Sequence, residues 1–192
     1  LAENLRTYKL RRLSTLLTCF AGLLNTLLTD KEHFQLKDYA EVLADIVLTT
    51  KGVQGIQQGK LQDPKYMEEL IGKTWRDKDL TPRNDLELVG VFFNRYDTVD
   101  NYVVFSNYFV EIHSGEILTK KFIIPQKQVK RSSEQDTRSY AGFKLMAAEA
   151  LQYPGYPPYR LKLKQSEERR VTQQDIEAIV SQANSDFGKA IA

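Results

Sequence analysis

Apolar positions are densest over residues 85–125, where short polar loops separate three runs, and this pattern predicts three consecutive β-strands. We expect them at 86–93, 102–112 and 116–124, where aromatic and β-branched residues suit a pleated, half-buried surface. In the second strand Val103, Phe105 and Phe109 occupy one face, while mostly apolar side chains occupy the other. Because neither face is polar, the pattern predicts a β-meander covered by helices.

The N-terminal quarter of the chain has the three-and-four spacing of an amphipathic helix. Its apolar seam consists of Leu10, Leu13, Leu17, Phe20, Leu24 and Leu27. A second seam over 36–53 follows a short linker, so we expect an antiparallel helical hairpin. The seam fits an intramolecular core better than a dimeric coiled coil. Basic residues precede the apolar run, as in a targeting segment, but polar residues interrupt it, and we predict no membrane span.

Later segments complete the expected architecture. Asp63-Pro64 predicts the start of a short helix, and Thr172 with Asp175 predicts a capping box that begins a terminal helix. Residues 140–151 fit a helix or a strand, and 159–164 fit a final edge strand. We therefore predict an α+β fold, with a helical hairpin and short third helix over 1–72. An antiparallel sheet with a C-terminal helix follows over 73–192, and the two regions are expected to pack as one unit.

Composition limits the possible classes of protein. The chain has 192 residues, 42% of them apolar, which is enough for a core. Its formal net charge of +2 gives no strong attraction to nucleic acid or membrane. Cys19 is the single cysteine in the sequence, which excludes an internal disulfide framework and a multi-cysteine zinc site. We predict no cofactor and no bound metal.

No standard catalytic motif occurs in the sequence, and two basic clusters are the remaining candidates for a binding site. They consist of Lys120, Lys121, Lys127, Lys130 and Arg131, and of Arg160, Lys162 and Lys164. If both clusters border one sheet face near Tyr108 or Tyr159, they can hold a phosphate backbone. The alternative, which the low net charge favours, is that these side chains solvate the sheet and guard an exposed edge strand against aggregation.

Scattered short segments resemble the region downstream of the zinc finger in bacterial SWIM zinc finger family proteins. They are Leu70 to Trp75, Leu86 to Asp97, Tyr108 to Ile117, Pro125, Tyr153-Pro154-Gly155 with Pro158 and Arg160, and Asn184 to Phe187. The resemblance implies a cytoplasmic protein whose finger binds DNA or protein. This chain lacks the Cys-x-Cys and Cys-x-His ligands of that finger, so zinc binding transfers to none of its residues.

These observations leave three hypotheses for function. The first is a non-enzymatic interaction module with a protein partner, because catalytic motifs are lacking and the predicted surfaces are apolar. The second is a nucleic-acid-binding domain that uses the two basic clusters. The third is an enzyme whose site is assembled from residues that carry no recognisable motif.

Overall fold

The structure is a computed structural model that describes residues 1–7, 10–70, 72–98 and 101–182. The chain divides into two compact units. The first is mainly Leu1–Thr74, and the second comprises Trp75–Thr98 and Tyr102–Ala192. The α+β class is therefore confirmed, with helices in the first unit and a five-stranded sheet followed by a C-terminal helix in the second.

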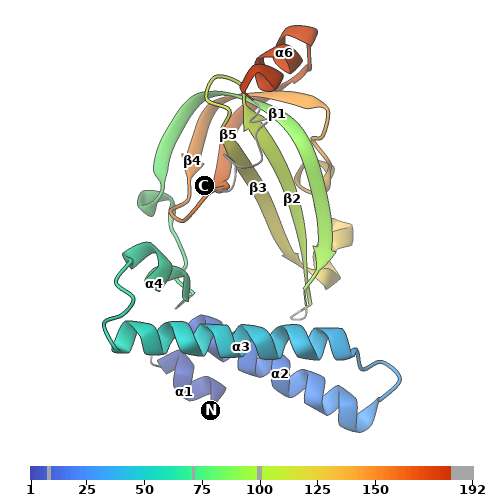
Figure 1. Cartoon of the computed structure of the whole chain (residues 1–192). Coiled ribbons are helices and arrows are strands. Elements are labelled where there is room, and N and C mark those ends of the chain that lie inside the picture. The colour runs from blue at the N-terminus through green and yellow to red at the C-terminus, as the bar shows by residue number, and fades with distance from the viewer. Residues whose placement is uncertain (8–9, 71, 99–100, 183–192) are drawn as a thin grey trace. The chain divides into compact units, whose positions relative to one another are not determined.

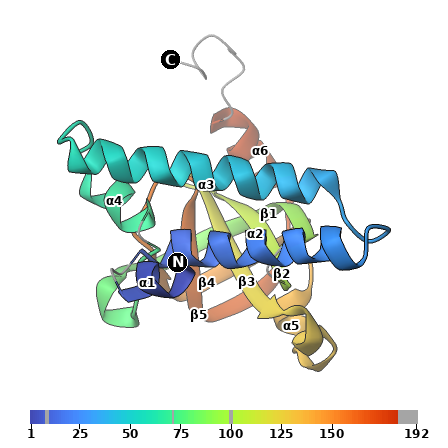
Figure 2. The same cartoon turned by 90° about the horizontal axis from the view of Figure 1, so that it is seen from below.

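Helices α2 and α3 form the centre of the first unit and lie side by side in Figure 2. The rings of Phe20 and Tyr39 lie 5.3 Å apart between centroids, whereas Leu36 and Leu43 of the expected second seam are exposed. Among the described residues, α2 is the one helix long and apolar enough to cross a membrane. The helices of this unit are α1 (Ala2–Thr7), α2 (Arg11–Thr29), α3 (Leu36–Gln57) and α4 (Pro64–Leu70).

The second unit is a five-stranded sheet that closes into a barrel in the order β1-β2-β3-β5-β4 (Figure 1). Strands β1, β2 and β3 pair antiparallel in chain order, and β4 pairs antiparallel with both β1 and β5. A short parallel pairing of Leu118–Lys120 with Tyr159–Leu161 joins β3 to β5. The strands are β1 (Thr81–Asp97), β2 (Tyr102–Glu111), β3 (Ile117–Pro125), β4 (Phe143–Gln152) and β5 (Tyr159–Arg170).

Strand β1 is long because it pairs with two neighbours. Residues 81–89 pair with β4, and residues 88–97 pair with β2. The register with β2 shifts between Gly90 and Phe92, and such a bulge bends and twists a strand. Figure 1 shows β1 arching over one end of the barrel as a result.

The barrel interior holds the main hydrophobic core. All five strands contribute to it, together with Tyr140 from the loop between β3 and β4. The buried residues are Leu86, Leu88, Phe109, Leu118, Tyr140, Leu145, Ala147, Ala150 and Leu161. Small alanines of β4 occupy part of this interior, so the alanine-rich segment that fitted helix or strand forms a strand here because it pairs on both sides.

The sheet closes with β5 between β3 and β4, so the edge-strand prediction is wrong for residues 159–161, which pair with β3. Among the described residues, 162–164 have no paired strand on the β3 side, and Lys162 and Leu163 pair with β4. The guard role that an exposed edge would give therefore has no basis at Arg160, whereas for Lys162 and Lys164, beyond the pairing with β3, it stays a prediction. The expected packing of the helical hairpin on the sheet stays a prediction.

The connection from β3 to β4 contains two short helices, η2 (Gln126–Arg131) and α5 (Glu134–Thr137), and returns to the sheet at Asn107. The Asn107 side chain donates to Arg138 O (3.1 Å) and accepts from Tyr140 N (2.7 Å). Beyond Tyr140, the amide of Gly142 donates to Gly90 O (2.8 Å). These bonds hold the Tyr140 ring in the core, 6.2 Å from Phe109 between centroids.

Helix α6 (Gln173–Gln182) is joined to the barrel by a partly buried charge cluster. Lys144 Nζ lies 2.7 Å from both Glu87 Oε2 and Asp175 Oδ1. The other oxygen of Asp175 accepts from the amide and hydroxyl of Thr172, which confirms the predicted capping box. The hydrogen bond from Lys144 lowers the pKa of Asp175 from 3.8 to about 2. The sequence spacing also predicts an apolar face on this helix, formed by Ile176, Ile179, Val180, Ala183 and Phe187. Ile176 and Val180 are exposed, and Ala183 and Phe187 lie outside the described residues.

Substituting Gly90 tests the close approach of the Tyr140 loop to β1. A Cβ atom at this position would lie 2.0 Å from Tyr140 O, and a backbone oxygen has little room to move. We expect Gly90→Ala to lower the free energy of unfolding by roughly 1–3 kcal/mol, the range for overpacked sites. Urea unfolding measures this loss. Val91→Ala changes a half-exposed neighbour and is the control, and equal losses for the two variants would contradict the packing.

The charge cluster at α6 predicts a pH-dependent stability. Because folding lowers the pKa of Asp175, its contribution is complete above pH 3.8 and disappears as the pH falls toward 2. Asp175→Asn should therefore cost roughly 1–2 kcal/mol at pH 7, and less as the pH drops below 4. Urea unfolding at several pH values measures the difference, with Glu177→Gln on the exposed side of α6 as control. A cost that stays constant from pH 7 to pH 2.5 would argue against this ion pair.

Candidate nucleic-acid interface

The outer face of the barrel carries a continuous row of side chains across four strands. Residues that pair directly opposite one another in a sheet project to the same face. Phe92 pairs with Tyr108, Tyr108 with Thr119, and Thr119 with Arg160. This row alternates in register with the core row of Phe109 and Leu118, so it lies on the outside of the barrel.

Aromatic rings are exposed on this outer face. Phe92 is 56% exposed and Tyr96 is 43% exposed. Phe92 also packs against Tyr108, with 5.6 Å between ring centroids. Tyr96, Val104 and Ile123 form a second row on the same face, and Ile123 at its end is 47% exposed. Flat apolar rings that are open to solvent provide stacking surfaces for planar ligands.

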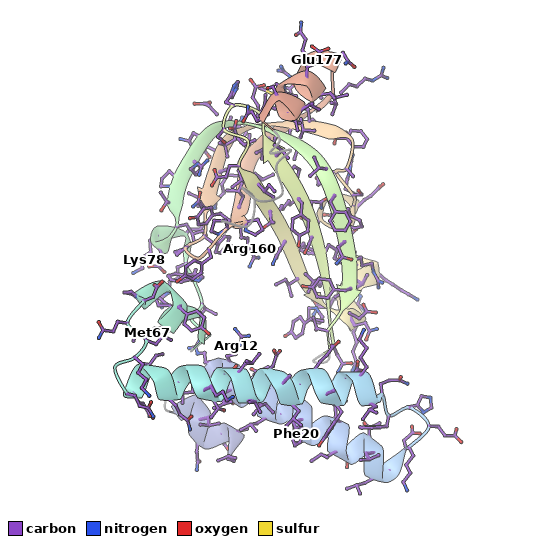
Figure 3. The ribbon with its side chains drawn as sticks, in the orientation of Figure 1. Arg12, Phe20, Met67, Lys78, Arg160 and Glu177 are labelled. Carbon is purple, nitrogen blue, oxygen red and sulfur yellow. The ribbon has the colours of Figure 1, made fainter. Side chains whose placement is uncertain are left out.

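Basic side chains lie beside these rings. Lys121 pairs with Ser106 in the row next to Phe92 and Tyr108, and Arg160 ends the row itself. Arg160 Nη2 donates to Lys121 O (3.1 Å), and its guanidinium lies 4.5 Å from the Tyr153 ring centroid. Figure 3 labels Arg160 on the barrel. The strand register therefore places one residue from each predicted basic cluster on one face.

Two buried polar atoms on this face have no hydrogen-bond partner within the described part of the chain. They are the Ser106 hydroxyl and Arg160 Nε. An unmatched buried polar atom costs free energy, so such atoms are uncommon in folded proteins. Both lie on the strands that flank β3, next to Lys121. We call the set Phe92, Tyr96, Tyr108, Lys121, Ile123 and Arg160 the aromatic face.

Lys162 continues the line of Arg160 along β5, since alternate residues of a strand share a face. Lys164 follows at a shift in the register between β5 and β4. Both lysines are engaged by Asp77 in the short helix η1 (Asp77–Asp79). Lys162 Nζ lies 2.7 Å from Asp77 Oδ1, and Lys164 Nζ contacts Asp77 Oδ2. Hydrogen bonds from Lys162 and then Lys164 lower the pKa of Asp77, and the bond to Asp77 raises the pKa of Lys162.

The other residues of the first cluster divide between two places. Lys127, Lys130 and Arg131 are exposed on η2, directly after β3 ends beside the start of β2. Within the described ranges these three side chains have no ion-pair partner. They extend the positive charge of Lys121 beyond the end of the sheet.

Lys120 is separated from its neighbour Lys121 by the alternation of the strand. It pairs with Asn107 on the inner side, and its ammonium lies 5.0 Å from the Tyr140 ring centroid. Arg138 approaches the same ring at 4.9 Å and forms a 3.0 Å ion pair with Glu168. Burial lowers the pKa of Lys120 and raises that of Tyr140. Lys120 therefore supports the core and contributes nothing to the aromatic face.

Two hollows outside the aromatic face combine fewer kinds of binding group. A cavity of about 370 Å³ between β1, β4 and β5 is lined by Asp85, Glu87 and Glu167 among others. A shallow apolar groove of about 560 Å³ runs along α3. No group of three or more His, Cys, Asp or Glu side chains that can hold a metal occurs among the residues that the structure describes.

Sequence reasoning did not select Phe92 and Tyr96 as site residues. The bulge between Gly90 and Phe92 reverses the alternation, so residues that continue the apolar run of β1 face outward beyond it. Alternation of apolar and polar residues does not reveal such a bulge. Gly90 is the one sequence feature that indicates it, because a glycine inside a strand often marks a bulge.

Comparison with known proteins gives no relative for this chain. No family model, no curated protein and no solved structure matches it.

The two lysine environments predict an order of titration. Burial lowers the pKa of Lys120 below its ordinary 10.5, whereas the bond to Asp77 raises the pKa of Lys162 above it. We expect the Lys120 amine to lose its proton before the Lys162 amine as the pH rises. Carbon-13 NMR of the reductively methylated chain measures both, and single Lys→Arg variants assign the signals. Titration of Lys120 after Lys162 would show that Lys120 does not project into the barrel.

Proposed function

We propose that this chain is a non-enzymatic binding module whose barrel binds single-stranded nucleic acid through the aromatic face. The observation that carries the proposal is the register that aligns exposed Phe92 and Tyr96 with Lys121 and Arg160. Single-strand binding combines aromatic rings, on which bases stack, with positive charges that follow the phosphates. Both elements lie here on one surface, although the net charge of the chain is only +2.

The order of the strands supports the same proposal. A five-stranded barrel with the order β1-β2-β3-β5-β4 and a long bent first strand has the arrangement of OB-type barrels. Such barrels bind oligonucleotides or oligosaccharides on the face of strands two and three. Tyr108 and Lys121 lie on that face here. A fold alone does not establish a function, so the proposal depends on the side chains of the aromatic face.

The exposed residues of η2 extend the proposed path. A strand that stacks on Phe92 and Tyr108 and continues past the end of β3 meets Lys127, Lys130 and Arg131. Their charges are available for phosphate contacts, because no acid within the described ranges neutralises them. Binding of this kind is independent of sequence and weakens with salt.

A protein partner is the second candidate, and the observation that favours it is the apolar stripe along α3. Leu36 is 71% exposed and Leu48 is 64% exposed, and both line the groove with Leu43 and Val47. Exposed apolar patches of this kind often mark interaction sites. We also propose, from the sequence resemblance, that the chain is a cytoplasmic member of the SWIM zinc finger family.

Removing one ring and one charge tests the aromatic face. We expect Phe92→Ala to weaken binding of a fluorescein-labelled oligothymidylate roughly tenfold, since stacking on an aromatic ring contributes about 1–3 kcal/mol per base. Lys121→Ala should reduce the slope of log affinity against log salt by about 0.7, which corresponds to one phosphate of a single strand. Fluorescence anisotropy across a salt series measures both effects.

The matched control is Tyr66→Ala, which removes an exposed ring from α4 of the helical unit. This variant should bind as the unchanged chain does. The proposal would be abandoned if the Phe92 and Tyr66 variants lost affinity equally, or if duplex DNA bound as tightly as the single strand, because duplex bases are not available for stacking.

A further inference from the structure

The contact between η1 and β5 consists of two lysines that bind one carboxylate, as an anion-binding site would. One carboxylate, that of Asp77, receives the ammonium groups of Lys162 and Lys164 on its two separate oxygens. The register of β5 with β4 shifts beside Lys164, and both lysines reach the same carboxylate. A phosphate group presents oxygens with comparable spacing and more negative charge, and clusters of basic side chains bind it by the same contacts.

The ion pairs with Asp77 can be exchanged for contacts with another anion. All three side chains are well exposed: 40% for Lys162, 36% for Lys164 and 51% for Asp77. Solvent-exposed ion pairs contribute little to stability, because water and salt compete for the same charges. The Asp77 carboxylate is charged at neutral pH, as an aspartate ordinarily is, and hydrogen bonds from Lys162 and Lys164 lower its pKa further, so it competes with other anions for the two lysines.

The short helix does not depend on this carboxylate for its position. Asp79 Oδ2 accepts from Arg76 N (2.9 Å), and Leu80 N donates to Asp77 O (3.2 Å) through the backbone. Leu80 is buried, and β1 begins at the next residue. Replacing the Asp77 side chain therefore leaves the other anchors of η1 in place.

We propose that Lys162 and Lys164 form a phosphate-binding site that the Asp77 carboxylate fills in the free chain. This inference rests on the proposed function, because it makes these lysines the continuation of the aromatic face beyond Arg160. A single strand that stacks on Phe92 and passes Arg160 reaches the two lysines along β5 and displaces Asp77 from them. Asp77 thereby limits the affinity of the chain for nucleic acid.

Replacing the two acids of η1 one at a time tests this site. Asp77→Asn frees both lysines, whereas Asp79→Asn removes the same charge from the same helix but leaves the lysines paired and keeps an acceptor for Arg76 N. We expect Asp77→Asn to bind oligothymidylate roughly three- to tenfold more tightly at low salt. Its salt slope should be steeper by about 0.7, as for one additional phosphate. Asp79→Asn should show neither the affinity gain nor the steeper slope.

The triple variant Asp77→Asn, Lys162→Gln, Lys164→Gln should lose the gain. If Asp77→Asn and Asp79→Asn bind alike while Phe92→Ala still weakens binding, the inference is wrong and the proposed function stands. If the unchanged chain binds no oligonucleotide, the proposed function fails. The lysine site is then judged by amide NMR shifts of residues 161–165 on addition of inorganic pyrophosphate. Shifts in Asp77→Asn and none in Asp79→Asn would support the site, and their absence from both would overturn it.

Discussion

The barrel depends on the requirement that β1 pair with two strands that are not adjacent to each other in the chain. Its first half serves β4 and its second half serves β2, with an overlap only at Leu88 and Val89. No straight strand can satisfy both partners, so the bend at Gly90 is a condition for closing the sheet. The same glycine admits the backbone of Tyr140 at a distance that no side chain would permit. Closure of the sheet and filling of its interior thus share one residue.

The bulge that follows this glycine also decides what the surface presents. Phe92 and Tyr96 face solvent because the alternation is reset there, and the pairing then places them in line with basic residues from β3 and β5. The consecutive residues Lys120 and Lys121 project to opposite faces of β3 because side chains alternate along a strand. One supports an aromatic ring of the core, and the other lies on the aromatic face. The strand register therefore concentrates positive charge on one face, although the net charge of the chain is only +2.

Local patterns in the sequence were enough to predict the three central strands, the capping box at Thr172 and the α+β class. They also identified the basic residues later found on the outer face. They failed where partners are distant in sequence. Residues 143–152 contain helix-favouring alanines, and only pairing with β1 and β5 makes them a strand, because tertiary contacts override weak local preference. The pairing of residues 159–161 with β3, which closes the sheet, depends equally on long-range contacts, and the sequence pattern did not predict it.

The short seam between β3 and β5 has a consequence for how the barrel assembles. Strands β1, β2 and β3 form one substructure of neighbouring strands, and β4 with β5 forms another. The two meet at a long seam between β1 and β4 and at three paired positions between β3 and β5. Native proteins open first where few backbone bonds hold them, so the three-pair seam is the natural place for local opening and for late closure during folding. Lys121 and Arg160 stand on opposite sides of it. Any ligand that spans them would therefore also hold the barrel shut.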